Sequence, residues 1–218
     1  MISRNDKLIE KDFKKLIDTF PKLNTKTINQ ANNAWLISGE MDICDTNGDY
    51  WETFEIKIVV PFTYPHCVIS VLETSQKIER SENRHINKIG VCCLDIDHKL
   101  LAMKQKGVNL LEFTKSKIYT FFANQIYFDQ TKEYADGDYH HYFEGIRQFY
   151  HEDLKISTDE EAIQILEFIF SKQKLGRNDQ CFCGTRKFKE CHLNQVDFLK
   201  SVGEGQLKVD IAGFKNEL

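Results

Sequence analysis

The stretch Trp35-Leu36-Ile37-Ser38-Gly39-Glu40-Met41-Asp42-Ile43 decides the fold of this chain. Its odd-numbered side chains are mostly apolar and several of the even-numbered ones are polar, which is the period of two of a half-buried β-strand. The pair Asn47-Gly48 follows, and both residues tolerate the positive φ of a hairpin turn. Residues 54–60 then repeat the alternation. The sequence therefore predicts an antiparallel β-hairpin.

The pattern outside this hairpin changes to that of helices and loops. Strands grouped together, with helices in a separate part of the chain, predict an α+β fold of three or four antiparallel strands whose sheet is covered on one face. Residues 74–108 are polar and irregular, so we expect a long loop there, and we expect the residues beyond 201 to fray. The expected further elements are helices at 6–20, 109–130, 141–151 and 158–172, and a third strand at 68–72.

Composition places the chain among ordinary globular proteins. It has 218 residues, of which 41% are hydrophobic and 28% charged. That length suits one main domain with an appendage. Seven cysteines and an N-terminus without an apolar leader favour the reducing cytoplasm. No stretch has the length of a membrane span, so no membrane partner is expected.

Charge is distributed unevenly along the chain. Residues 1–171 carry 20 Lys and Arg against 27 Asp and Glu, a net charge of −7. Residues 172–200 carry 7 against 3, a net charge of +4. The basic segment could contact an acidic partner or nucleic acid, or it could be only a solvated linker. No arginine-rich stripe accompanies it, so specific nucleic-acid recognition is not expected.

Three thiols and an imidazole fall within twelve residues near the C-terminus: Cys181, Cys183, Cys191 and His192. Zinc prefers four such ligands in a tetrahedron. A turn at Gly184 would bring the second pair back to the first. So short a segment lacks a core of its own, and metal binding would supply its folding energy. The sequence therefore predicts a structural zinc site.

Residues 176–192 also resemble a known family, the SEC-C zinc motif. The shared features are Gly-Arg-Asn at 176–178, Cys-x-Cys-Gly at 181–184 and Lys-Phe-Lys-x-Cys-His at 187–192. The resemblance implies that the four residues above hold zinc and that the motif is an accessory that helps to bind a partner. It implies nothing about the chemistry of the rest of the chain.

A second resemblance covers about residues 6–130. Pro61-Phe62-Thr63-Tyr64-Pro65, His85-Ile86-Asn87 and Gly90-Val91-Cys92-Cys93-Leu94 are similar to elements of the ubiquitin-conjugating enzyme family. The resemblance implies an N-terminal helix, a four-stranded antiparallel meander and a long later helix. It also implies that Cys93 is the nucleophile, that Asn87 supports the oxyanion or the active-site loop, and that His85, the third site residue, is the structural histidine of its element. Ile86 stands where the family has proline.

The stretches 121–125, 137–140 and 144–146 narrow this resemblance. They look like the stand-alone bacterial conjugating-type proteins of short type II CBASS anti-phage operons. That resemblance implies a partner with a C-terminal glycine, a cyclic-oligonucleotide synthase, which would form a thioester with Cys93. The chain has no phosphate-cradling glycine loop, so we do not expect it to adenylate a carboxylate itself. Three alternatives stay open: a separate activating enzyme supplies the activated carboxyl, the protein acts on an already activated or exchangeable bond, or it only captures its partner.

Two other functions stay open at this point. The chain could be a non-catalytic, zinc-containing adaptor that docks the partner, or a cysteine peptidase using Cys93 with His85 or His140. Without the surrounding motifs, buried and unreactive thiols would be the more usual interpretation, and we expect this for Cys44, Cys67 and Cys92.

The expected domain plan has four parts. They are a conjugating-enzyme-like domain at 1–155, a helix and linker at 156–175, the zinc motif at 176–195 and a tail at 196–218.

Overall fold

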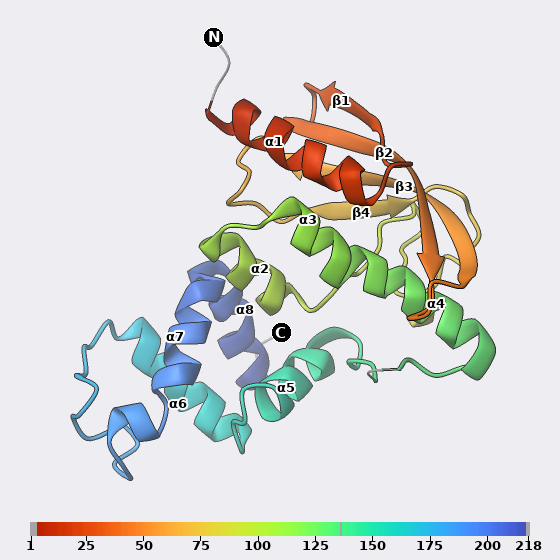
Figure 1. The fold of residues 1–218 in the computed structure, drawn as a ribbon. Coiled ribbons are helices and arrows are strands. Elements are labelled where there is room, and N and C mark those ends of the chain that lie inside the picture. Colours follow the sequence, from red (N-terminus) through yellow and green to blue (C-terminus); the bar gives the residue numbers. More distant parts are fainter. Residues whose placement is uncertain (1–3, 136, 217–218) are drawn as a thin grey trace. The chain divides into compact units, whose positions relative to one another are not determined.

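The computed structural model describes residues 4–135 and 137–216. They form two compact units: unit 1 comprises residues 4–95, 106–135 and 137–138, and unit 2 comprises residues 96–105 and 139–216. Figure 1 labels the elements of both. Among the described residues, no helix has both the length and the apolar character that crossing a membrane would require.

Unit 1 contains a four-stranded antiparallel sheet in the order β1-β2-β3-β4. The strands are β1 (Thr25–Asn29), β2 (Ala34–Cys44), β3 (Tyr50–Pro61) and β4 (Ser70–Glu73). Residues of β2 and β3 pair in one register up to a bulge at Ile43/Cys44, which lies beside the turn. This confirms the predicted hairpin and the α+β class. Strand β1 was not predicted.

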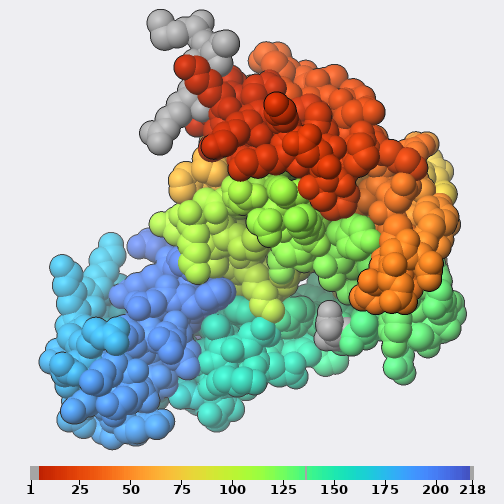
Figure 2. All heavy atoms as spheres, in the orientation of Figure 1, coloured from red at the N-terminus to blue at the C-terminus, as the bar shows by residue number. Residues whose placement is uncertain are grey.

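The helices of unit 1 are α1 (Arg4–Thr19), α3 (Leu110–Phe113) and α4 (Thr120–Thr131), with a π-helical segment, Thr114–Tyr119, joining the last two. The helix predicted at 109–130 is thus confirmed, and the Asn109 side chain caps it by accepting the Glu112 N–H at 3.1 Å. Helix α4 packs against β2 and β3. The Phe54 and Phe122 rings, 4.8 Å apart, form part of that contact. Figure 2 shows α1 and the green α3–α4 segment in contact on one face of unit 1.

Unit 2 is helical. Its helices are α2 (Asp97–Lys106, which ends at the border with unit 1), α5 (Tyr142–Glu152), α6 (Asp159–Phe170), α7 (Leu193–Val202) and α8 (Glu204–Phe214). Two expectations are wrong here. Helix α2 occupies part of the predicted loop 74–108, and α8 lies where the chain was expected to fray. Helix α8 is ordered because it buries Leu207 and Phe214 in the core of unit 2.

A buried polar network joins α2, α5 and α8 within unit 2. The side chains of His98 and Asp210 are fully buried, and His98 Nε2 lies 2.8 Å from Asp210 Oδ2. The Tyr150 hydroxyl donates to the same oxygen at 2.7 Å, and Gln206 donates to Asp210 Oδ1 at 2.9 Å. Burial raises the pKa of Tyr150 far above its usual range, so its hydroxyl stays neutral and remains a donor.

Candidate functional site

The cysteine hairpin, residues 85–93, is held on the β4 edge of the sheet. Val91 bridges Leu72, and the Cys92 N–H donates to the Val71 carbonyl at 2.9 Å. The Gly90 carbonyl accepts the Glu73 N–H at 2.9 Å. Gly90 has φ +92°, and a Cβ there would lie 2.7 Å from the Glu73 carbonyl oxygen. Glycine is therefore required where the hairpin meets the strand.

The hairpin has an inward and an outward face. Ile86 bridges Cys92, and both side chains are buried. The Cys93 N–H donates to the His85 carbonyl at 2.8 Å. His85 and Cys93 are therefore the next opposite pair of the hairpin, adjacent to the Ile86–Cys92 pair. Unlike Ile86 and Cys92, neither His85 nor Cys93 is buried, so these two residues lie on the outward face of the hairpin. Cys93 is exposed, as a nucleophile must be, and the His85 side chain is about a quarter exposed (23%).

The two adjacent thiols therefore differ in reactivity. Desolvation raises the pKa of Cys92 to about 12, so this thiol does not ionise near neutral pH. The expected burial of Cys92 and Cys67 is confirmed, whereas Cys44 is only half-buried. Of the pair at 92–93, Cys93 alone meets the exposure that a thiolate nucleophile needs.

Asn87 organises the turn of the hairpin. Its side-chain oxygen accepts the N–H groups of Ile89 at 3.0 Å and Val91 at 2.9 Å. Its own backbone N–H donates to the Val91 carbonyl at 3.0 Å. These contacts correspond to the loop-supporting role, one of the two roles that the family resemblance implies, since the amide oxygen is directed to its own turn.

His85 is held from two sides. Its backbone has φ 51°, a left-handed conformation that histidine adopts more readily than most residues do. Its Nε2 lies 2.8 Å from Asp138 Oδ1, and its ring centroid lies 5.3 Å from that of Tyr134. Asp138 was not among the residues predicted for the site. The other peptidase candidate, His140, is exposed.

The base of the hairpin is anchored to α4 by Arg84, which is buried although charged. Its Nε donates to the Gln125 side-chain oxygen at 2.8 Å, and its Nη2 donates to the Gln125 carbonyl at 3.2 Å. Gln125 returns a bond of 3.1 Å to the Arg84 carbonyl, and Arg84 also lies over the Phe128 ring. These bonds hold the start of the cysteine hairpin, directly before His85, against α4.

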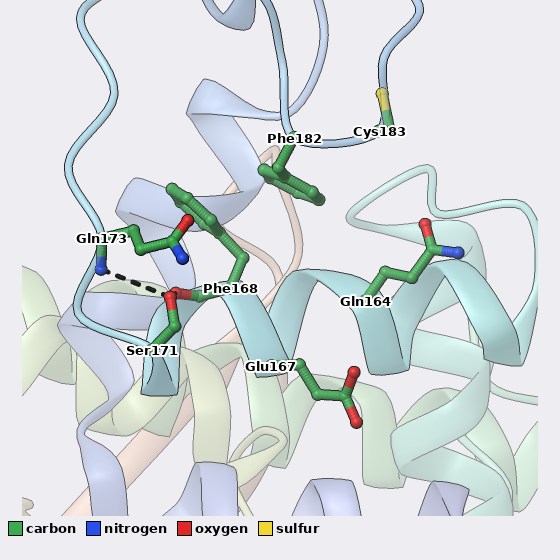
Figure 3. Close-up of a pocket in the computed structure, with 7 residues that line it drawn as sticks. All are labelled: Gln164, Glu167, Phe168, Ser171, Gln173, Phe182 and Cys183. Atoms are coloured by element: carbon green, nitrogen blue, oxygen red, sulfur yellow. Dashed lines mark hydrogen bonds between the residues drawn. The ribbon is translucent and has the colours of Figure 1, made fainter.

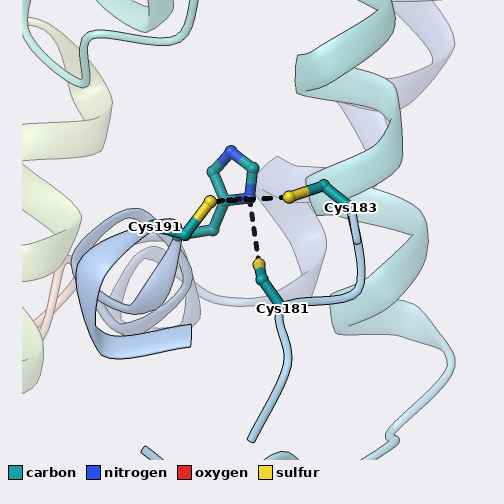
Figure 4. Close-up of side chains that lie close together, drawn as sticks. Cys181, Cys183 and Cys191 are labelled. Atoms are coloured by element: carbon teal, nitrogen blue, oxygen red, sulfur yellow. Dashed lines mark hydrogen bonds between the residues drawn. The ribbon is translucent and has the colours of Figure 1, made fainter. Parts of the chain in front are cut away.

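Unit 2 brings together all four residues predicted as metal ligands. Their ligand atoms lie within 4.8 Å of one another, and Figure 4 shows the three thiols converging. The His192 Nδ1 lies 3.3 Å from Cys181 Sγ and 3.5 Å from Cys191 Sγ, which is 3.4 Å from Cys183 Sγ. A tetrahedral zinc ion requires ligand separations of roughly 3.5–3.8 Å. The donor set and its spacing are compatible with zinc bound through Nδ1 of the histidine.

Local backbone bonds bring these ligands together. The Cys181 N–H donates to the Arg186 carbonyl and the Gly184 N–H to the Cys181 carbonyl, each at 2.8 Å. Desolvation raises the pKa of the Cys181 thiol. Desolvation acts in the same direction on Cys183, but hydrogen bonds with Thr185, Cys191 and Cys181 together outweigh it and lower that pKa. Of Cys181 and Cys183, the latter therefore ionises more readily.

Glu161 supports the cluster from outside it. Its Oε1 lies 2.7 Å from His192 Nε2, the imidazole nitrogen that faces away from the thiols. Its Oε2 accepts the Ser157 N–H at 2.6 Å, and its backbone N–H donates to the Thr158 side chain that caps α6. Desolvation opposes its charge, but the bonds from Ser157 and His192 lower its pKa. This carboxylate therefore keeps the proton of His192 on Nε2 and leaves Nδ1 free for the metal.

Replacement of Glu161 with glutamine is expected to weaken zinc binding by about 10- to 100-fold, because an amide orients the imidazole less strongly than a carboxylate does. Glutamine remains a good residue at this helix position, so α6 should persist. Competition with a chromophoric chelator measures the affinity. Glu160→Gln, which changes an exposed neighbour, is the matched control. Equal affinities for both variants would show that Glu161 has no orienting role.

A surface pocket lies beside the metal-ligand cluster (Figure 3). The Phe168 and Phe182 rings stack at 4.4 Å on one side of it, and Phe182 also stacks on His192 at 5.1 Å. The remaining lining residues are polar except for Cys183: Gln164, Glu167, Ser171, Gln173 and Cys183. The cluster and the pocket are thus continuous in structure.

Comparisons with protein-family models, with curated proteins and with solved structures gave no match to this chain.

Proposed function

We propose that this protein is a cysteine-dependent acyl carrier of the ubiquitin-conjugating type. The observation that carries this proposal is the placement of Cys93, which is exposed and lies opposite His85 in a hairpin held on the sheet edge. The four-stranded meander with α1 before it and α4 after it supports the same interpretation, since this is the element order that the family resemblance implies.

Cys93 would accept a partner's C-terminal carboxyl group as a thioester and pass it to an amine or to water. A C-terminal glycine suits this position, because it has no side chain to hinder attack at the carbonyl carbon. The partner proposed is a cyclic-oligonucleotide synthase of a CBASS anti-phage system, acting with a separate activating enzyme in the cytoplasm. Zinc at the four-residue cluster would stabilise unit 2 and take no part in the transfer.

The test is a mixture of the protein with such a synthase and an activating enzyme, separated by non-reducing electrophoresis. A thiol-sensitive adduct is expected for the natural protein. Cys93→Ala should abolish the adduct, and Cys93→Ser should retain it as a thiol-resistant ester. Cys92→Ala is the matched control and should still form the adduct, because its thiol is buried and not ionised. An adduct that persists in Cys93→Ala would contradict the proposal.

Cys93→Ala should also leave the fold intact. The side chain is small and exposed, so we expect the free energy of unfolding to fall by less than about 1.5 kcal/mol. Urea unfolding followed by tryptophan fluorescence measures it, because Trp35 and Trp51 both lie in unit 1. A loss above this limit would mean that the thiol is a packing group.

A non-catalytic adaptor is the second candidate. The pocket at Phe168 and Phe182 favours it, since stacked rings with polar neighbours can receive a side chain of a partner. In that case the partner would bind the Cys93→Ala protein as tightly as the natural one, and no covalent adduct would form with either.

A further inference from the structure

We propose that Asp138 is a positioning residue that orients His85 as the acid–base partner of Cys93. This inference rests on the proposed function, because it gives His85 a chemical role in the thioester steps. Within unit 1 the Asp138 carboxylate contacts the His85 imidazole, and His85 lies opposite Cys93 in the cysteine hairpin. Asp138 is distant from both residues along the chain, so the fold brings it to them.

The first observation is the contact between Asp138 and His85. The carboxylate oxygen Oδ1 lies 2.8 Å from Nε2, a hydrogen-bond distance. A carboxylate accepts only, so Nε2 must carry the proton. The remaining ring nitrogen, Nδ1, is then the one that can take and return a proton. The Tyr134 ring packs beside the imidazole and restricts its orientation.

The second observation is the register of the hairpin. The bridge Ile86↔Cys92 and the bond from the Cys93 N–H to the His85 carbonyl place residues 85 and 93 directly opposite each other. This backbone contact makes His85 and Cys93 direct neighbours across the hairpin. Arg84 and Gln125 fix that backbone against α4.

Several other charged or titratable groups lie near His85 and Cys93, and each has a partner or a fixed protonation state. Arg84 precedes it, but its guanidinium is engaged with Asp129 at 2.5 Å and with Gln125. Tyr134 presents its ring, and desolvation raises the pKa of its hydroxyl, which therefore stays neutral. Beyond Cys93, Asp95 pairs with Lys117 of the π-helical segment. On the inward face, Glu73 pairs with Arg80 beside Cys92.

The proposed step balances as follows. His85 Nδ1 takes the proton from the Cys93 thiol, and the thiolate attacks the carbonyl carbon of a C-terminal glycine held as a thioester on the activating protein. The new S–C bond forms, the old S–C bond breaks, and the leaving thiolate takes the proton from His85. No electrons are gained or lost. In the second half, His85 takes a proton from the attacking amine or water and returns it to Cys93.

The test uses iodoacetamide, which alkylates the thiolate and requires no partner. The natural protein is alkylated over a range of pH values, and the Cys93 peptide is quantified by mass spectrometry. A protonated imidazole held by Asp138 favours the neighbouring thiolate. In Asp138→Asn the pH midpoint of Cys93 alkylation should therefore rise by about one pH unit. The rate of Cys93 alkylation at pH 7 should fall about tenfold.

Three further variants make this test specific. Glu133→Gln removes an exposed carboxylate next to Tyr134 but leaves the His85–Asp138 pair and the Arg84 anchor intact, so its alkylation profile should match that of the natural protein. His85→Asn should give the same shift as Asp138→Asn, since asparagine tolerates the left-handed backbone at this position. The double variant should show no further shift of the alkylation midpoint, because both substitutions disrupt the same Asp138–His85 pair.

An unchanged Cys93 profile in both Asp138→Asn and His85→Asn would overturn this inference. Equal shifts in Asp138→Asn and Glu133→Gln would also overturn it, because they would show only a general effect of charge. The failure of the proposed function looks different: the profiles would shift as expected, yet no adduct with a partner's C-terminus would form.

Discussion

Replacement of Cys181 with serine is expected to release zinc from the purified protein and to unfold much of unit 2. Cys181 is the buried thiol of the cluster, and its Sγ lies 3.3 Å from His192 Nδ1. Structural zinc sites contribute folding free energy directly, so losing one of four ligands removes more stability than an ordinary core substitution. The effect should reach α6 and α7, because Phe182 and Phe188 pack in the same core as both helices.

Metal analysis and hydrogen exchange measure this outcome. Peptides from residues 159–202, which include α6 and α7, should lose protection, while the fluorescence transition of Trp35, a buried residue of unit 1, should stay in place. A strong chelator should have the same effect on the natural protein. Cys44→Ser is the control and should keep its zinc. Retention of zinc by Cys181→Ser, or collapse of both units together, would contradict the account.

Replacement of Asp210 with alanine is expected to destabilise unit 2 by about 3–5 kcal/mol, the usual cost of breaking a buried charged contact by removing one partner. Asp210 accepts hydrogen bonds from Tyr150 and Gln206 and contacts His98. Its loss would leave three polar groups without their acceptor. His98 Nδ1 already lacks a hydrogen-bond partner among the described residues, so the histidine would keep no polar contact of its own.

Hydrogen exchange of peptides from α2, α5 and α8 measures this loss locally, and thermal unfolding followed by circular dichroism measures it for the helices as a whole. Asp197→Ala, which removes an exposed carboxylate from α7, is the matched control and should change the stability by less than about 0.5 kcal/mol. If Asp210→Ala were as stable as this control, the network would contribute little to the fold.

The parts of the fold that were predictable from sequence are those with a clear period. The alternation at 35–43 and 54–60 predicted β2 and β3, and the apolar face at 6–20 predicted α1. Strand β1 escaped because it is a short edge strand, Thr25-Lys26-Thr27-Ile28-Asn29, without a buried face. Edge strands of this kind are commonly polar, so their sequences resemble those of loops.

Helices α2 and α8 were not predicted, and the reason is the same for both. Each contributes a polar residue to the core, His98 from α2 and Asp210 from α8, and the two side chains pair with each other. Polar residues are normally expected on the surface of a helix, so the sequence of neither segment shows an apolar face at helical spacing. The pairing spans 112 residues of sequence and has no local signal.

In the candidate sites, too, local sequence patterns were predictable and contacts made only through the fold were not. The clustering of the four ligands was predictable because their spacing is local, whereas the role of Cys93 rests on the motifs around it and stays a prediction. Glu161 and Asp138 were not predicted, since each contacts its histidine only through the folded chain. A partial signal existed for Glu161: Thr158-Asp159-Glu160-Glu161 is a capping-box pattern, which predicts the start of α6 but not a contact with His192.

The most direct measurement of the central claim is acyl transfer to Cys93 from a synthetic peptide thioester ending in glycine. Loading would be followed by peptide mass spectrometry at neutral pH, in the folded protein and in the same protein unfolded by urea. We predict that the peptide acyl group appears on Cys93 faster in the folded protein than in urea, and that Asp138→Asn slows only the folded reaction. Loading of Cys93 no faster in the folded protein than in the unfolded chain would contradict the account.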